Sequence, residues 1–211
     1  MLIVVGGHSR NIGKTSVVAG LIQALPQFEW TAVKITQFGH GICAASGGDC
    51  GCSLAPDHPY AIAEERHPGG SDSGRFLAAG ARRSYWARTA AGQISNCVPA
   101  IRELCSSSRN VIIESNSIVE FLKPDAYLVV LDFAQRDFKV SCRRFLSRAD
   151  ACVVIEHGFR EPLWSGVAPE IWERKPRFPV RPPQYVTAAL TEFVNGRLLA
   201  AASGRPEGAS V

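Results

Sequence analysis

One segment restricts the fold of this chain more than any other, namely VVGGHSRNIGKTSVVAGL at residues 4–21. A short β-rich run ends at two glycines, and the residues after Lys14 place apolar side chains at helical spacing until Pro26. A phosphate-binding loop needs flexible backbone amides, a lysine, a hydroxyl for magnesium and the positive N-terminal end of a helix. The segment contains each of these, so it predicts a strand, a phosphate loop and a helix.

The spacing within this loop is unusual. The common pattern GxxxxGK(S/T) would put its first glycine at His8, whereas the glycine here is Gly7, which leaves five residues before Gly13. A chance Gly-Lys-Thr at a helix start is the alternative, but the combination of strand, glycines and helix favours nucleotide binding. The predicted nucleotide-binding residues are Gly7, His8, Ser9, Arg10, Asn11, Ile12, Gly13, Lys14, Thr15 and Ser16.

Further apolar runs predict a parallel sheet. They are too apolar to have one face in water, and helical patterns separate them, as expected for strands covered on both sides. The fold class is therefore α/β, a three-layer P-loop NTPase fold with a mostly parallel central sheet and helices on both faces. The expected strands are 2–5, 30–36, 82–88, 110–114, 125–132 and 150–156, and the expected helices follow Lys14 and cover 73–81, 97–105, 138–148 and 188–202.

Length and composition predict one domain over residues 1–203, followed by a flexible tail at 204–211. Residues 37–70 show little periodicity and are expected to form an insert, because long connections of this kind are usually functional or disordered. Residues 173–183, ERKPRFPVRPP, are rich in proline and arginine, which predicts a surface strap rather than a central strand or a regular helix.

The phosphate-loop segment resembles that of dethiobiotin synthetase and the cobyric acid synthase group. Lys34 in AVKITQFGHG falls where those enzymes end their second strand with a lysine, and Glu114 in VIIESNS falls where they carry an acidic residue. The glycine-rich turn of that group is replaced here by ESNSI. This resemblance implies an ATP-dependent small-molecule ligase or kinase.

A second stretch, SDSGRFLAAGA at 71–81, resembles a segment of MobB, the molybdopterin-guanine dinucleotide biosynthesis adaptor family. The MobB phosphate loop is one residue shorter. This resemblance implies an accessory NTPase in molybdenum cofactor biosynthesis, with a cofactor-biosynthesis protein as partner. Many proteins of the branch that includes MobB pair across a face that carries the nucleotide, so the resemblance also suggests a homodimer. Both families belong to one branch of the P-loop NTPases.

Magnesium bound with a nucleoside triphosphate prefers oxygen ligands. Thr15 and Glu114 are the predicted magnesium ligands, because Glu114 ends an apolar strand and ligands of open α/β sheets bind at that end of the strands. Asp72 is the competing carboxylate. The alternative for Glu114 is a strand terminus that faces solvent.

The residues predicted to act in catalysis are Lys14, Lys34 and Glu114. Lys34 ends a strand at the same edge of the sheet, where it could hold an anionic small-molecule substrate or a phosphate. Arg10 and Arg75 are candidates for neutralising charge during phosphoryl transfer. The alternative for Lys34, Arg10 and Arg75 is an ordinary surface side chain.

The insert at 37–70 carries soft metal ligands. A CxC pair can bind one ion, although the usual CxxC pairs are missing, and the alternative is a loop with free thiols. The candidates for a zinc ion or an iron–sulfur cluster are His40, Cys43, Cys50 and Cys52, with His58 or His67 as replacements for His40.

Composition argues against membrane, secreted and nucleic-acid-binding proteins. No apolar run reaches the ~18–20 residues of a membrane span, and the first residues lack a secretory signal, so a cytoplasmic protein is expected. The net charge of +4 is scattered, which argues against a nucleic-acid partner. The sequence predicts Mg-dependent binding and hydrolysis of ATP or GTP, with a nonhydrolytic adaptor as a further alternative. Because no clear NKxD motif follows the late strands, the choice between ATP and GTP stays open.

Overall fold

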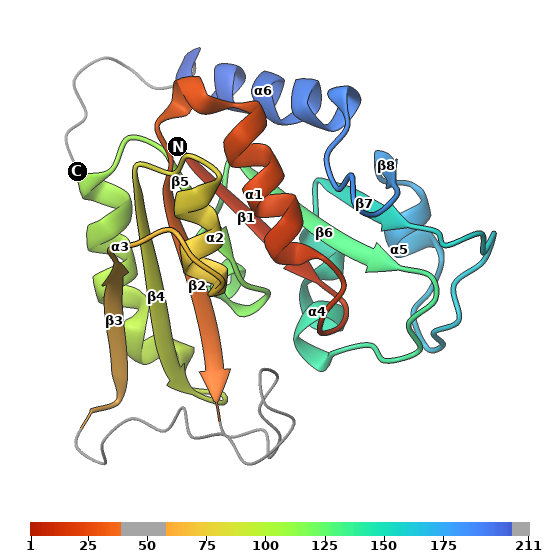
Figure 1. Ribbon diagram of the computed structural model, residues 1–211. Helices are drawn as coiled ribbons and strands as arrows, with labels where there is room; N and C mark the ends of the chain where they lie inside the picture. The colour runs from red at the N-terminus through yellow and green to blue at the C-terminus, as the bar shows by residue number, and fades with distance from the viewer. Residues whose placement is uncertain (39–57, 204–211) are drawn as a thin grey trace.

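The computed structural model describes residues 1–38 and 58–203. These residues form one eight-stranded sheet and the helices around it (Figure 1). The strand order is β3-β4-β2-β5-β1-β6-β7-β8, and all neighbouring strands are parallel except β3 and β4. The strands are β1 (Leu2–Gly7), β2 (Thr31–Phe38), β3 (Tyr60–Glu65), β4 (Arg83–Ala90), β5 (Val111–Glu114), β6 (Ala126–Asp132), β7 (Ala151–Ile155) and β8 (Arg177–Val180).

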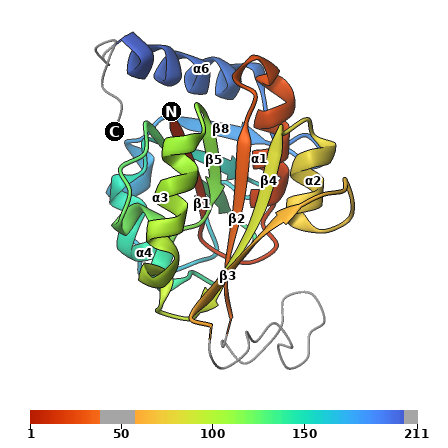
Figure 2. The same ribbon diagram turned by 90° about the vertical axis from the view of Figure 1, so that its left-hand side faces the viewer.

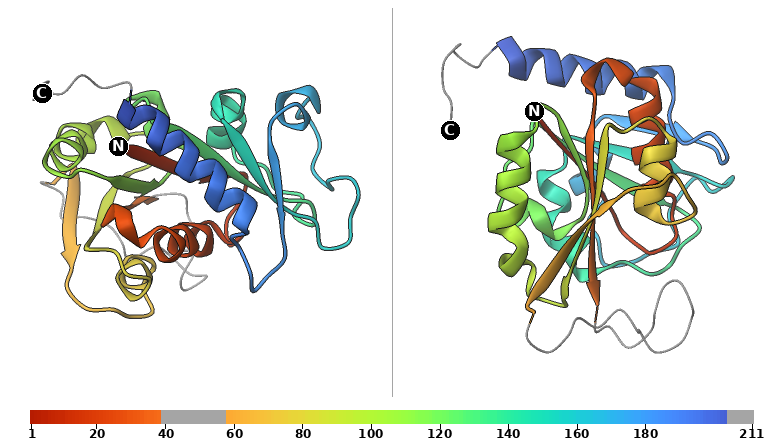
Figure 3. Two further views of the ribbon diagram at one scale, coloured as in Figure 1. Left: turned by 90° about the horizontal axis from the view of Figure 1, so that it is seen from above. Right: turned by 60° about the vertical axis from the view of Figure 1, so that its left-hand side comes forward.

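Helices cover both faces of this sheet, as Figure 2 shows. One apolar cluster joins α1, α2 and α6 to one face, and a second joins α3, α4 and α5 to the other. In Figure 3, α6 crosses above the sheet. The helices are α1 (Lys14–Ala24), α2 (Asp72–Ala78), α3 (Val98–Ser107), α4 (Val140–Phe145), α5 (Glu170–Glu173) and α6 (Ala188–Ser203). The predicted α/β fold, with a mostly parallel sheet between two helical layers, is confirmed.

The central strands are apolar because helices cover them on both sides. All residues of β5, β6 and β7 are buried, so neither of their faces alternates with polar side chains. The parallel register of β1, β5 and β2 pairs Val5 with Glu114 and Glu114 with Lys34. Glu114, the last residue of β5, therefore lies level with Lys34 and next to the end of β1, whereas β2 continues to Phe38, so Lys34 does not end its strand as predicted.

Two strands lie in segments where no strand was expected, although the exclusion of a central strand at 173–183 holds. Within the predicted insert at 37–70, Tyr60–Glu65 forms β3, which pairs antiparallel with β4. Within the predicted strap at 173–183, Arg177–Val180 forms β8, which pairs with β7. Both are edge strands, where backbone pairing with one neighbour suffices and a proline such as Pro179 is tolerated.

Four cysteines lie in the described part of the chain, and all four are free thiols. Burial raises the pKa of Cys142 and of Cys152 to about 12, so both behave as small apolar side chains of the core. None of the helices at 1–38 and 58–203 combines the length and apolar character that crossing a bilayer requires.

Candidate nucleotide-binding site

The loop between β1 and α1 covers His8–Gly13. Two of its residues adopt left-handed backbone conformations, Asn11 with φ 54° and Gly13 with φ 82°. Gly13 is the N-cap of α1, and no described side chain caps this end of the helix or places an acidic group in its first turn. The first amides of α1 thus present the positive end of the helix, which favours an anion.

The side chain of Lys14 extends back to the start of this loop. Its Nζ donates a hydrogen bond of 2.6 Å to the backbone oxygen of Ser9. Burial lowers the pKa of Lys14 to about 8; the charge of Glu114 opposes this shift, whereas Lys139 and Lys34 add to it. Lys14 is therefore a desolvated cation whose charged form an anion would stabilise.

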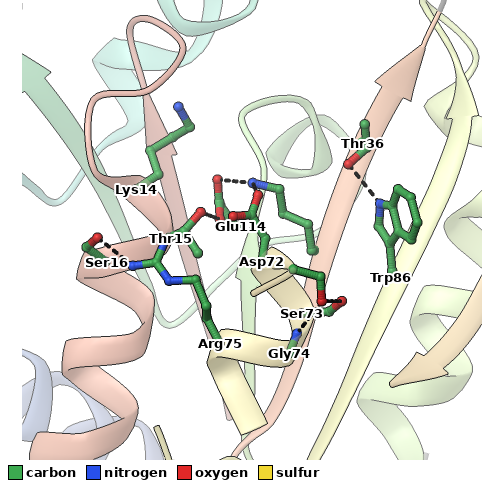
Figure 4. Close-up of polar contacts among 12 residues, drawn as sticks. Lys14, Thr15, Ser16, Thr36, Asp72, Ser73, Gly74, Arg75, Trp86 and Glu114 are labelled. Atoms are coloured by element: carbon green, nitrogen blue, oxygen red, sulfur yellow. Dashed lines mark hydrogen bonds and ion pairs between the residues drawn. The ribbon is translucent and has the colours of Figure 1, made fainter. Parts of the chain in front are cut away.

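The buried carboxylate of Glu114 is the centre of the polar cluster in Figure 4. Thr15 Oγ1 donates a hydrogen bond of 2.8 Å to Glu114 Oε2, and Lys34 Nζ donates one of 2.5 Å to Glu114 Oε1. Lys34 also forms an ion pair of 2.8 Å with Asp72, at the start of α2. Burial lowers the pKa of Lys34, but the carboxylates of Glu114 and Asp72 outweigh it and raise the pKa overall.

The two candidate arginines lie near this cluster on different elements. Arg75 of α2 donates a hydrogen bond of 2.9 Å to Ser16 Oγ, which links α2 to the first turn of α1. Arg10 is partly exposed on the loop, and its charge lowers the pKa of Lys139 after the larger effect of burial. The structure thus brings Thr15, Lys34, Asp72 and Glu114 into direct contact, with Arg75 beside them.

Asn116 contacts the two glycines that end β1, just before the loop. Its Oδ1 accepts a hydrogen bond of 2.7 Å from Gly7 N, and its Nδ2 donates one of 2.9 Å to Gly7 O. A Cβ at Gly6 would lie 2.4 Å from Asn116 Oδ1 and 2.8 Å from the Tyr127 hydroxyl, so only glycine fits there. The sequence pattern did not indicate Asn116, because its role depends on the register of β1 and β5.

His8 stands where the common phosphate-loop pattern has glycine, and it is fully buried. Its Nε2 accepts a hydrogen bond of 2.9 Å from Asp132 N, which assigns the proton to Nδ1, 2.8 Å from Asp137 O. Ser9 Oγ donates a hydrogen bond of 2.9 Å to the Asp137 carboxylate. Burial lowers the pKa of His8, consistent with a neutral ring. The long loop is therefore fastened to the segment that follows β6.

Tyr185, in the connection between β8 and α6, lies against Gly13 at the end of the loop. A Cβ built on Gly13 would lie 2.1 Å from its ring atom Cε1. The next residue, Val186, lies close to Gly20 of α1, where an added Cβ would lie 2.6 Å from Val186 Cγ2. Sequence reasoning missed Tyr185, because nothing in the sequence relates residue 185 to residue 13.

The architecture is similar to that of solved proteins. HypB from Helicobacter pylori, solved in complex with nickel, superposes with a TM-score of 0.55 at 15% identity, over 99% of this chain and 91% of HypB. The chain has the fold of the P-loop NTPases. A second match is LpxK from Aquifex aeolicus, solved with ATP, with a TM-score of 0.46 and 17% identity over 84% of this chain and 53% of LpxK. No protein-family model and no curated protein sequence matches the chain.

Within this P-loop fold, Thr15 and Glu114 present the oxygen atoms that could hold magnesium. A hydroxyl and a carboxylate are the hard ligands that this ion prefers, and the bond of 2.8 Å between them places both at one point beside the phosphate loop. The two side chains therefore fit a magnesium ion. Lys34 donates its hydrogen bond to Oε1, the other oxygen of the Glu114 carboxylate.

The predicted zinc or iron–sulfur ligands His40, Cys43, Cys50 and Cys52 lie outside the described residues. Among the described residues, no group of three His, Cys, Asp or Glu side chains could hold a metal ion. His58 and His67, the suggested replacements for His40, are both exposed.

Proposed function

We propose that this protein binds a nucleoside triphosphate with magnesium and hydrolyses it. The observation that carries the proposal is the hydrogen bond of 2.8 Å between Thr15 and Glu114, formed beside Lys14 at the uncapped start of α1. It brings together the hydroxyl, the carboxylate and the lysine that phosphate-loop chemistry uses. The P-loop NTPase fold supports the proposal, since it presents this loop at the carboxyl edge of a parallel sheet.

Each residue then has a defined role. The amides of residues 7–16 and the Lys14 amine bind the phosphates, while Thr15 and Glu114 hold the magnesium ion. That ion would supply charge neutralisation on the phosphate oxygens. Lys34 orients Glu114 through its bond of 2.5 Å, and Asp72 keeps Lys34 charged. Phosphoryl transfer of this type depends mainly on positioning and electrostatic stabilisation, which a preformed network provides.

For the biological process, we propose a MobB-like accessory NTPase that acts in cofactor biosynthesis with a protein partner. The MobB-like segment at 71–81 supports this role, because it includes α2 and places Asp72 2.8 Å from Lys34. A ligase or kinase of the dethiobiotin-synthetase type is the second candidate, favoured by Lys34 itself, which could hold an anionic substrate next to the phosphates. Slow hydrolysis without a second substrate would support the accessory role, whereas turnover that needs a carboxylate or phosphate acceptor would support the ligase or kinase.

The test is calorimetric titration of ATP and of GTP, each with and without magnesium, on the wild type, Lys14→Ala and Lys123→Ala. Lys123 is exposed and precedes β6, at the opposite edge of the sheet from the loop. The proposal predicts magnesium-dependent binding in the wild type and Lys123→Ala, and its loss in Lys14→Ala. Equal affinity of Lys14→Ala and the wild type would contradict it, and the comparison of ATP with GTP would determine the base preference.

A further inference from the structure

The segment that follows β6 packs against the start of the phosphate loop. His8 and Ser9 are fastened to Asp137, and Lys139 N donates a hydrogen bond of 2.7 Å to the backbone oxygen of His8. This last bond belongs to the backbone of Lys139, so it fixes the residue against the loop whatever its side chain does. Lys139 therefore starts directly beside the loop, at the N-cap position of α4.

The side chain of Lys139 is partly buried and makes no hydrogen bond or ion pair with any residue at 1–38 or 58–203. Its charge interacts with those of Arg10, Lys34, Asp137 and Glu114, and also with that of Lys14. Burial lowers the pKa of Lys139, and the charges of Arg10 and Lys34 lower it further, against the carboxylates of Asp137 and Glu114. These are the groups that surround the phosphate loop, so the amine lies within their common field.

Lys14 and Lys139 differ from Lys34 in that neither forms an ion pair with a described carboxylate. Lys34 is neutralised by Glu114 at 2.5 Å and Asp72 at 2.8 Å. Lys14 makes its hydrogen bond to a backbone oxygen, and neither Lys14 nor Lys139 forms an ion pair with a described carboxylate. Burying a cation without a counter-charge is costly, and an anion held between the two amines would repay that cost.

We infer that Lys139 is a second phosphate-binding lysine, which contacts the terminal phosphates of the bound triphosphate together with Lys14. The inference rests on the proposed function and adds a catalytic residue to that site. The terminal phosphates are favoured over the nucleoside because Lys139 interacts with Lys34 and Glu114, the residues at the predicted magnesium end. A lysine at this position would stabilise charge on the transferred phosphoryl group.

The test compares Lys139→Met with Lys139→Arg and with Lys123→Met as the matched control. Methionine removes the charge but keeps an unbranched chain and the backbone bond to His8. The probes are ATP and ADP, or GTP and GDP if the wild type prefers guanine, and inorganic pyrophosphate, all with magnesium. Thermal unfolding of each variant establishes that it is folded before titration.

The expected result is a loss of about tenfold or more in triphosphate affinity for Lys139→Met. The loss should be clearly larger for the triphosphate than for the diphosphate, Lys139→Arg should recover much of it, and Lys123→Met should bind like the wild type. A merely structural role would weaken all probes alike. Affinities of Lys139→Met equal to those of Lys123→Met, or equal losses for triphosphate and diphosphate, would overturn the inference and leave the proposed function intact.

Failure of the proposed function gives a different pattern. A wild type that binds pyrophosphate through Lys139 but neither ATP nor GTP would support the anion site and contradict nucleotide binding. A wild type that binds none of the probes would overturn both.

Discussion

Thr15 and Glu114 are separated by 99 positions in the chain and joined by a hydrogen bond of 2.8 Å. The bond connects the first turn of α1 to the last residue of β5. Its geometry follows from the parallel pairing of β1 with β5, which aligns Val5 with Glu114. The hydroxyl is therefore delivered to the carboxylate by the fold rather than by a flexible loop.

Replacing Thr15 with valine should remove the magnesium dependence of triphosphate binding, because valine keeps the shape of threonine but has no hydroxyl ligand. Affinity measured without magnesium should stay close to that of the wild type. Thr36→Val is the matched control, since it removes a hydroxyl that bonds Trp86 at 3.0 Å on a neighbouring part of the site. Calorimetric titration with and without magnesium checks this, and an unchanged magnesium effect in Thr15→Val would contradict the role of Thr15.

Breaking the pair of Lys34 and Glu114 should destabilise the fold strongly. Lys34→Met leaves the buried Glu114 carboxylate without its nearest cation, with an expected cost of about 3 kcal/mol. The double variant Lys34→Met and Glu114→Gln should lose less, because the buried carboxylate is gone and the other carboxylate that loses its lysine, Asp72, is partly exposed to water. Urea unfolding measures both. In the exposed pair of Arg83 and Glu64, Arg83→Met should cost no more than about 1 kcal/mol. If the double variant were the less stable of the two, the carboxylate would not be the cause.

The lowered pKa of Lys14 predicts a pH dependence of stability. With a pKa of about 8 in the folded protein and 10.5 as the ordinary value, the unfolded chain binds more protons between these pH values. The free energy of unfolding should therefore gain from Lys14 as pH rises from 8 to 10.5, and carry the full penalty below 8. Lys14→Met should be more stable than the wild type at pH 7, by up to about 3 kcal/mol, and this advantage should vanish near pH 10.5.

Urea unfolding of both proteins across that pH range, without nucleotide, measures this effect. Lys123→Met provides the control, since Lys123 is exposed. A constant difference between Lys14→Met and the wild type over the whole range would show that burial does not disfavour the charge of Lys14.

Gly13→Ala should destabilise the protein for two separable reasons. The backbone of Gly13 has φ 82°, and the added Cβ would lie 2.1 Å from the Tyr185 ring. Gly92→Ala isolates the first reason, because Gly92 has φ 77° and nothing within 4 Å of its Cβ position. We expect about 1 kcal/mol for Gly92→Ala and clearly more for Gly13→Ala. In a Tyr185→Ala background, the effect of Gly13→Ala should fall to that of Gly92→Ala; an undiminished effect would contradict the contact.

The central part of the fold was predictable because its strands are buried on both faces. Runs such as DAYLVVLD leave little choice but a covered parallel strand, and the glycines around the phosphate loop mark its turn. The edges were not predictable in the same way. β3, with the sequence YAIAEE, and β8, with RFPV, are held by backbone pairing to one neighbour, which leaves only a weak trace in side-chain pattern.

In the candidate site, too, some residues could be predicted from the sequence and others could not. Lys34 and Glu114 lie on adjacent strands near the edge predicted for ligands, so strand reading alone could suggest that they meet, and they do lie 2.5 Å apart, although Lys34 is inside β2 rather than at its end. Asn116, Asp137 and Lys139 reach the phosphate loop from turns whose shape depends on tertiary packing. The polar side chains of such turns resemble those of any exposed loop, so the sequence offers no signal for them.

The position of β1 has a consequence for synthesis on the ribosome. This strand lies between β5 and β6, whose residues begin at 111 and 126. Residues 2–7 therefore leave the exit tunnel long before either partner strand exists, and until then their backbone groups are unpaired and their apolar side chains are exposed. The phosphate loop next to them gains its supports from residues 114, 116, 137 and 185 in that order. The phosphate loop is therefore synthesised early but is fully supported only after residue 185 has been made.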